Sequence, residues 1–125
     1  MTTPCEVHLY ASSQDKARKV ASDILESSKK LESKYNFYDP DSYLSRLNKR
    51  ETKTLDHQTK EILKQAKYFY TKTKGIFDVT VGTLTQSMQY KSIKEIEESR
   101  EKLSAFVGCE HFEIKRDTLH FTNPS

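Results

Sequence analysis

The chain has 125 residues, of which 34% are hydrophobic and 31% charged, and its formal net charge at neutral pH is +3. This length predicts one domain with a small core, in which seven Tyr and six Phe compensate for the low hydrophobic content. The 21 basic and 18 acidic residues are mixed along the chain rather than clustered, which argues against a nucleic-acid-binding surface.

The first predicted element is a strand over residues 5–11, where polar and apolar side chains alternate. One face of this strand would carry Cys5, Val7, Leu9 and Ala11. A helix follows, because Ser12 and Asp15 form a capping pattern and apolar residues then recur with a period of about 3.6. We expect its stripe to lie on a sheet; the stripe consists of Ala17, Val20, Ala21, Ile24, Ser28, Leu31 and Tyr35.

A turn-rich segment comes next, in which Pro40 excludes helical geometry for the residue before it. Ser42 can cap a short helix over residues 43–48. Two leucines would anchor that helix, Leu44 and Leu47. Tyr38 lies in the constrained loop, where its ring either stacks on a planar ligand or closes the core.

A second long helix is expected from its cap, Asp56, to about Lys74. Its buried stripe would comprise Ile62, Leu63, Ala66, Phe69, Tyr70 and Thr73. The residues after it, Gly75 to Thr83, are compact and apolar except for one carboxylate and two hydroxyls. Gly75 fits a helix cap, and Gly82 permits close approach of another group or a ligand. The pattern is typical either of a cap followed by a buried strand or of a ligand site formed by Tyr38, Phe77 and Asp78.

Residues 86–90 are ambiguous, and Ser92 with Glu95 then forms a capping box for a third long helix closed by Gly108. The stripe of that helix would be Ile93, Ile96, Arg100, Leu103, Phe106 and Val107. The chain ends in a predicted hairpin, in which Phe112 and Ile114 face inward with Leu119 and Phe121. This order predicts an α+β fold, with helices on one face of a mostly antiparallel sheet, in a single domain over residues 1–125.

Motifs of common chemistry are absent from the sequence. No nucleophile motif or phosphate-binding loop occurs, and no cysteines or histidines have zinc-site spacing, so we predict neither catalytic nor metal-binding residues. Asp39, Asp41 and Ser42 lack the glycine and the terminal glutamate of a calcium loop. Cys5 and Cys109 either pair in an oxidising compartment or are two small buried residues.

The sequence is compatible with more than one cellular compartment. The sequence contains no run of about 18 apolar residues and no basic start followed by an apolar core, and Cys5 follows no apolar segment. As it stands, the chain is typical of a cytoplasmic protein. A leader removed before Met1 would instead indicate the periplasm or a membrane surface.

Three segments of the chain occur in the same order, and with similar residues, in one known family. They are the opening Met1-Thr2-Thr3-Pro4-Cys5-Glu6-Val7, the stretch Phe37-Tyr38-Asp39-Pro40-Asp41-Ser42-Tyr43-Leu44-Ser45-Arg46-Leu47-Asn48, and Gly75-Ile76-Phe77-Asp78-Val79-Thr80-Val81-Gly82. The last resembles the Gly-x-Phe-Asp-x-Thr-Val-Gly-Pro-Leu signature of the ApbE family, the FAD:protein FMN transferases. The second is similar to that family's Asp-Ser-Glu-Leu-Ser-Arg-Leu-Asn segment and the tyrosine before it. The resemblance spans essentially the whole chain.

This resemblance implies the N-terminal part of a T-fold-like, magnesium-dependent enzyme that cuts FAD and attaches FMN to a threonine of an acceptor protein. Carried over to matching positions, it implies that Met1, Tyr38, Ile76, Phe77 and Asp78 contact FAD. The residue types suit that role. An aromatic ring offers a stacking face, a methionine packs softly on a flat ring, and a carboxylate accepts from ribose or ring N–H groups.

The sequence also departs from the family pattern. Thr2, Tyr43 and Thr83 stand where the family has glycine, glutamate and proline, and the family's magnesium ligands have no counterpart among these residues. Because phosphoryl transfer depends on a metal ion, we expect this chain alone to be inactive. The alternatives are a non-catalytic module that binds flavin, nucleotide or protein, and a homo-oligomer formed through an uncovered apolar face.

Overall fold

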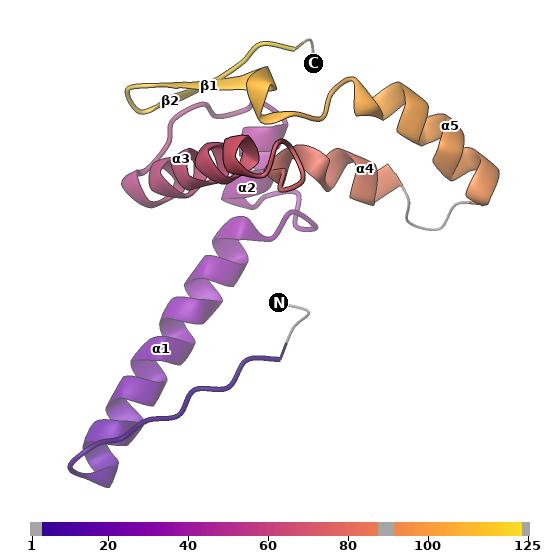
Figure 1. Ribbon diagram of the computed structural model, residues 1–125. Helices are drawn as coiled ribbons and strands as arrows, with labels where there is room; N and C mark the ends of the chain where they lie inside the picture. The colour runs from indigo at the N-terminus through magenta and orange to yellow at the C-terminus, as the bar shows by residue number, and fades with distance from the viewer. Residues whose placement is uncertain (1–3, 88–91, 124–125) are drawn as a thin grey trace. The chain divides into compact units, whose positions relative to one another are not determined.

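The computed structural model describes residues 4–87 and 92–123, and its contacts divide the chain into two compact units, Met1–Thr52 and Lys53–Ser125 (Figure 1). Met1, the first predicted FAD contact, lies outside the described residues. So does much of the ambiguous segment 86–90. That residues 1–125 form a single domain stays a prediction.

The first unit contains two helices in mutual contact, α1 (Gln14–Tyr35) and α2 (Tyr43–Asn48). The cap of α1 is Ser13 rather than the predicted Ser12, and its hydroxyl accepts the Lys16 N–H at 3.4 Å. The cap of α2 is Ser42, as predicted, and it accepts the Ser45 N–H at 3.1 Å. Leu47 of α2 is buried, which confirms its role as an anchor.

Two predictions for the first unit are wrong. Residues 5–11 form no strand and are exposed. The stripe of α1 is not buried on a sheet, since α1 has no buried residue and Leu31 is 41% exposed. Both errors have one physical reason. A strand needs a neighbour to pair its backbone groups, and a helix stripe needs a second surface; the described part of this unit contains no strand.

The second unit holds α3 (His57–Lys72) beside a hairpin of β1 (Phe112–Lys115) and β2 (Thr118–Phe121) (Figure 1). The strands are antiparallel and pair in the predicted register, with Ile114 opposite Leu119. Residues 53–55 cover the outer edge of β2, because Leu55 N–H donates to Asp117 O and Leu119 N–H to Lys53 O, each at 2.8 Å. The predicted α+β class with an antiparallel sheet is confirmed.

The core of the second unit lies between α3 and the hairpin. Its members are at most 5% exposed: Leu55, Thr59, Ala66, Cys109, Phe112 and Leu119. Asp56 caps α3 as predicted, with its Oδ1 accepting the Thr59 N–H at 2.9 Å. The predicted stripe of α3 is only partly right, since Ile62 and Phe69 are about half exposed.

The rest of the second unit is helical. It comprises the 3-10 helix η1 (Val79–Val81), α4 (Gly82–Ser87), α5 (Ile93–Ser104) and the 3-10 helix η2 (Cys109–His111). The capping box of α5 is confirmed, because Ser92 N–H donates to Glu95 Oε2 at 2.8 Å and Glu95 N–H to Ser92 Oγ at 3.4 Å. α5 ends at Ser104, before Gly108, and Arg100 is exposed rather than on the stripe. Within residues 4–87 and 92–123, no helix has the length and apolarity needed to cross a membrane.

Candidate functional site

The end of α3 is a tight turn that the local sequence determines. Gly75 adopts φ 83°, in the left-handed region that glycine tolerates best, and its N–H donates to Tyr70 O at 2.9 Å. Thr73 secures the turn from inside, because its hydroxyl donates to Phe69 O at 2.8 Å and accepts the Phe77 N–H at 2.9 Å. The predicted turn at this helix end is confirmed, but the cap is Thr73 and Lys74 already has φ 54°, so Gly75 follows the cap and does not form it.

The buried strand that one interpretation placed after this cap is wrong. The chain enters η1 and then α4, and Val79 and Val81 are each more than 40% exposed. The physical reason is local. Asp78 Oδ1 accepts the Thr80 N–H at 2.8 Å, and a side-chain acceptor at this position starts a helical turn in preference to an extended chain.

Asp78 is held by three contacts from within the second unit. Besides the Thr80 N–H, the Thr80 hydroxyl donates to Asp78 Oδ1 at 2.7 Å, and the Cys109 Sγ lies 3.6 Å from the same oxygen. The Thr80 hydroxyl also accepts the Gly108 N–H at 2.7 Å. Burial, with the nearby Asp78 charge as the next cause, raises the pKa of the Cys109 thiol to about 11, so this thiol is protonated at neutral pH.

The geometry of Asp78 leaves one side of its carboxylate available. Among the described residues, the three contacts all end on Oδ1 and none on Oδ2. The half-buried Asp78 carboxylate is already fixed in this way. It therefore loses little rotational entropy when it accepts a hydrogen bond from a hydroxyl or N–H group of a ligand.

Ile76 and Phe77 form the tip of the same turn. Ile76 is 91% exposed and Phe77 45% exposed. The Phe77 ring packs edge-on against the Phe69 ring, with centroids 6.0 Å apart. Phe77 is thereby held in place, whereas the side chain of the preceding residue, Ile76, is exposed to solvent. The three predicted contact residues of this segment, Ile76 to Asp78, therefore lie together at one end of α3.

Gly82 does not approach another group of the chain. It has ordinary helical geometry with φ −51°, and a Cβ added there would meet nothing within 4 Å. The prediction that another group of the chain comes close to Gly82 is therefore wrong, and the space beside this backbone is open.

Tyr38, the remaining predicted contact, belongs to the first unit. Its side chain is 59% exposed, so it does not close a core, and its ring packs on Phe37 with centroids 4.0 Å apart. The loop is held by local hydrogen bonds. Tyr38 N–H donates to Asn36 Oδ1 at 3.1 Å, and the Ser45 hydroxyl donates to Phe37 O at 3.2 Å. The loop thus presents an exposed aromatic ring on a fixed backbone.

The two cysteines differ in their surroundings. Cys109 is buried at 1% exposure, as one of the two interpretations had it, and Cys5 is exposed. Among residues 4–87 and 92–123, no three His, Cys, Asp or Glu side chains lie close enough together to hold a metal ion.

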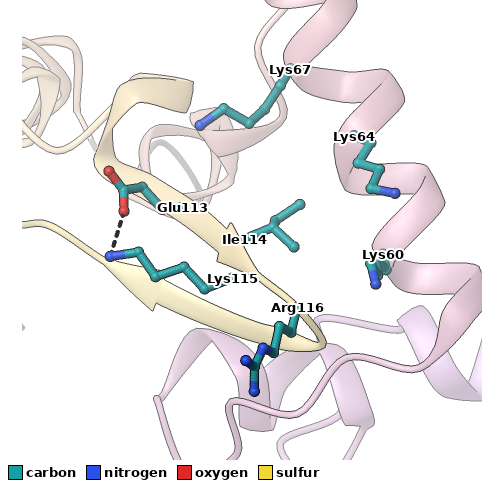
Figure 2. Close-up of a pocket in the computed structure, with 7 residues that line it drawn as sticks. All are labelled: Lys60, Lys64, Lys67, Glu113, Ile114, Lys115 and Arg116. Carbon is teal, nitrogen blue, oxygen red and sulfur yellow. Dashed lines mark ion pairs between the residues drawn. The ribbon is translucent and has the colours of Figure 1, made fainter.

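Sequence reasoning missed a groove between α3 and β1 (Figure 2). This groove has a volume of about 590 Å³, and its walls carry Lys60, Lys64 and Lys67 on one side and Glu113 to Arg116 on the other. The available signal was the spacing of the three lysines, which places them on one face of a helix. Because basic and acidic residues are mixed along the whole chain, no site was predicted at these lysines.

Comparisons with known proteins identify the fold and the family. A model of the ApbE family matches residues 1–125. The solved structure of the flavin transferase ApbE from Vibrio cholerae is similar, with a TM-score of 0.63 and 24% sequence identity over 88% of this chain and 37% of that one. This likeness shows a shared fold, and the chain spans only about 37% of that protein's length. No curated protein matches the chain in sequence.

Proposed function

This chain belongs to the ApbE family, and we propose that it is part of an FAD:protein FMN transferase in which the turn after α3 contacts FAD. One observation carries the proposal: Ile76 is 91% exposed on a turn that Gly75, Thr73 and Asp78 hold in place. An apolar side chain exposed on a preorganised backbone suits ligand binding, because little conformational entropy is lost when the ligand arrives.

We assign a role to each residue of the turn. Ile76 and the exposed part of Phe77 pack on the flat ring system of FAD, and Asp78 Oδ2 accepts from a ribose hydroxyl or a ring N–H group. Tyr38 offers a stacking face from its own unit, and Met1 packs on the ring in the same proposal.

In the proposed reaction the family's Mg²⁺ would neutralise charge as FMN passes from FAD to a threonine of the acceptor protein. The described residues offer no cluster of three metal-ligating side chains, so they do not fit such an ion and we assign no step through it. We therefore propose that residues 1–125 alone bind FAD without transferring FMN.

A titration of FAD, followed by flavin fluorescence with and without Mg²⁺, tests the binding. We expect Kd in the micromolar range, independent of Mg²⁺. Ile76→Ala removes three carbons, each worth about 0.8 kcal/mol when fully buried, so it should weaken binding by roughly tenfold to fiftyfold. Ile93→Ala is the matched control, because Ile93 is also exposed, at 78%, but lies on α5. Failure of FAD to bind at about 1 mM, or equal effects of both variants, would contradict the proposal.

Asp78 is tested separately. Asp78→Asn keeps an oxygen to accept the Thr80 N–H but turns the outward acceptor into an amide donor. We expect this variant to keep its far-ultraviolet circular dichroism and to bind FAD at least tenfold more weakly. An unchanged Kd would remove Asp78 from the proposed site.

A homo-oligomer is the second candidate. Two exposed apolar side chains on the stripe of α1, Val20 and Leu31, favour it, since such a stripe is normally covered by another surface. Sedimentation at increasing concentration measures it directly, and a stable monomer at high concentration would exclude it.

A further inference from the structure

The groove between α3 and β1 presents a row of positive charge. Lys60, Lys64 and Lys67 line it from one face of α3, and Figure 2 shows the Lys67 side chain extending toward the hairpin. With a rise of 1.5 Å per residue, the row is about 10 Å long. Arg116 stands at the hairpin turn that closes one end of the opposite wall. The groove is thus lined by basic residues over a length of about three residues of extended chain.

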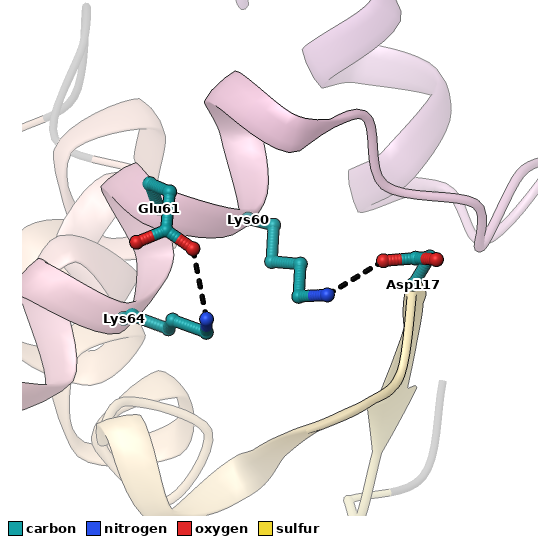
Figure 3. A network of polar contacts seen from close by, with 4 residues as sticks. All are labelled: Lys60, Glu61, Lys64 and Asp117. Atoms are coloured by element: carbon teal, nitrogen blue, oxygen red, sulfur yellow. Dashed lines mark hydrogen bonds and ion pairs between the residues drawn. The ribbon is translucent and has the colours of Figure 1, made fainter.

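Only part of this charge is compensated. Lys60 pairs with Asp117 at 2.6 Å and Lys64 with Glu61 at 2.8 Å (Figure 3). Lys115 pairs with Glu113 at 2.9 Å. Five cations in and beside the groove therefore face three carboxylates.

The two remaining cations, Lys67 and Arg116, make no ion pair with a carboxylate among the described residues. The Lys67 Nζ donates to the carbonyl oxygens of Cys109 and Phe112 at 2.8 and 2.6 Å, so neutral groups hold it in place and its charge is not cancelled. Arg116 makes no ion pair within residues 4–87 and 92–123. The groove consequently favours a ligand with negative charge.

The outer edge of β1 supplies a second kind of recognition. The Thr122 N–H donates to His111 O, just before β1, which fixes residues 113 and 115 as the positions of β1 that bond to the other strand. The N–H and C=O groups of Ile114 therefore point away from β2, toward the groove. The same alternation explains why Phe112 O is turned outward and accepts from Lys67.

We propose that this groove binds an extended acidic segment of a partner protein, which adds to the edge of β1 while its carboxylates face the lysines of α3. An exposed strand edge is a template for an added strand, and alternate side chains of that strand would point toward the α3 row. None of the lining residues is aromatic, which disfavours single-stranded nucleic acid, since that ligand relies on base stacking. A second copy of this chain is disfavoured by its own net charge of +3. The inference does not depend on FAD binding.

A fluorescein-labelled peptide of eight residues that alternates Glu and Thr is the probe, and the Gln–Thr peptide is its neutral counterpart. The full 125-residue chain should bind the acidic peptide at least tenfold more tightly than the neutral one, and raising the salt concentration should weaken this binding. The double variant Lys64→Gln with Arg116→Gln should weaken it at least tenfold. Lys94→Gln with Lys102→Gln on α5 is the charge-matched control and should change Kd less than twofold.

Amide hydrogen exchange tests the added strand independently of charge. The Ile114 N–H should exchange at least tenfold more slowly when the acidic peptide is present, because it then donates to the peptide backbone. The proposal is overturned by absence of binding at about 1 mM peptide, by equal losses in the two double variants, by unchanged exchange at Ile114, or by tighter binding of an oligothymidine of equal charge.

Discussion

Thr80 and Asp78 are joined by two hydrogen bonds, from the Thr80 N–H and from its hydroxyl, and both end on Asp78 Oδ1 at 2.8 and 2.7 Å. The same hydroxyl accepts the Gly108 N–H. One side chain therefore connects the turn after α3 to the segment that leads into the hairpin. The position of the proposed FAD-contacting residues relative to the core depends on this connection.

Replacing Thr80 by valine keeps the shape of the side chain and removes its hydroxyl. The hydrogen bond to a carboxylate and the acceptor for Gly108 are both lost, so we expect the free energy of unfolding to fall by about 1–3 kcal/mol. Urea denaturation followed by circular dichroism measures this. Thr80→Ser retains the hydroxyl and should recover most of the stability; a Thr80→Val variant as stable as the wild type would contradict the role of the hydroxyl.

Gly75 and Gly82 should respond in opposite ways to alanine. At Gly75 an added Cβ would have room, 3.6 Å from the Tyr70 ring, but φ 83° strains any other residue by about 1–2 kcal/mol. Gly82 is helical and surrounded by open space, so alanine there should raise stability by about 0.5–1 kcal/mol. Thermal unfolding of the two variants distinguishes them. A loss of stability in Gly82→Ala would show a contact that the structure does not contain.

Cys109 should resist alkylation at neutral pH. Its thiol is buried, and its pKa is raised to about 11, whereas the thiolate is the reactive form. In the Cys5→Ser variant, iodoacetamide labelling measured by mass spectrometry should be slow near pH 7 and should accelerate as the pH rises from about 9 toward 11. Rapid labelling at pH 7 would contradict the burial. Cys109→Ser, with only the exposed Cys5, is the fast-reacting control.

The hydrogen bond from Tyr70 to Glu110 should make stability depend on pH at both extremes. At 2.7 Å it raises the pKa of Tyr70 to about 12 and lowers the pKa of Glu110. The Tyr70 contribution is present below its ordinary pKa of 10.0 and is lost as the pH rises toward 12. The Glu110 contribution is present above 4.5 and is lost as the pH falls through the lowered pKa.

Urea midpoints of the wild type and Tyr70→Phe across the pH range test this linkage. We expect the difference between them to be largest from about pH 5 to pH 9 and to shrink on either side. A difference that is constant with pH would mean that the hydrogen bond contributes nothing to stability.

The sequence predicts well where the governing contact is local. Ser42, Asp56 and Ser92 were correctly identified as helix caps, because the N–H that each one accepts lies three residues ahead. The hairpin register followed from alternation together with the short turn between the strands, since a slip by one residue would move Phe112 and Ile114 off the face of Leu119 and Phe121. Gly75 was placed correctly at the end of α3 for the same reason, since its N–H donates to Tyr70 O five residues back, although Thr73 is the cap.

The sequence predicts poorly where burial depends on a second surface. The alternation over residues 5–11 and the stripe of α1 have the right period but no covering element in their unit, and so they remain exposed. The segment after Gly75 has the apolar composition of a buried strand, yet the Asp78 side chain directs it into a helical turn. A period describes which residues share a face and does not say whether anything covers that face.

By itself, then, the sequence determined the helix starts, the hairpin, the family signature and the identity of Ile76, Phe77 and Asp78 as candidate contacts. Only the tertiary structure showed that Thr80 and Gly108, separated by 28 positions, share a hydrogen bond, and that three lysines of α3 line one groove with residues 113–116. The reason is physical. Caps and turns are decided by interactions within a few residues, whereas these contacts exist only after segments far apart in the chain have packed together.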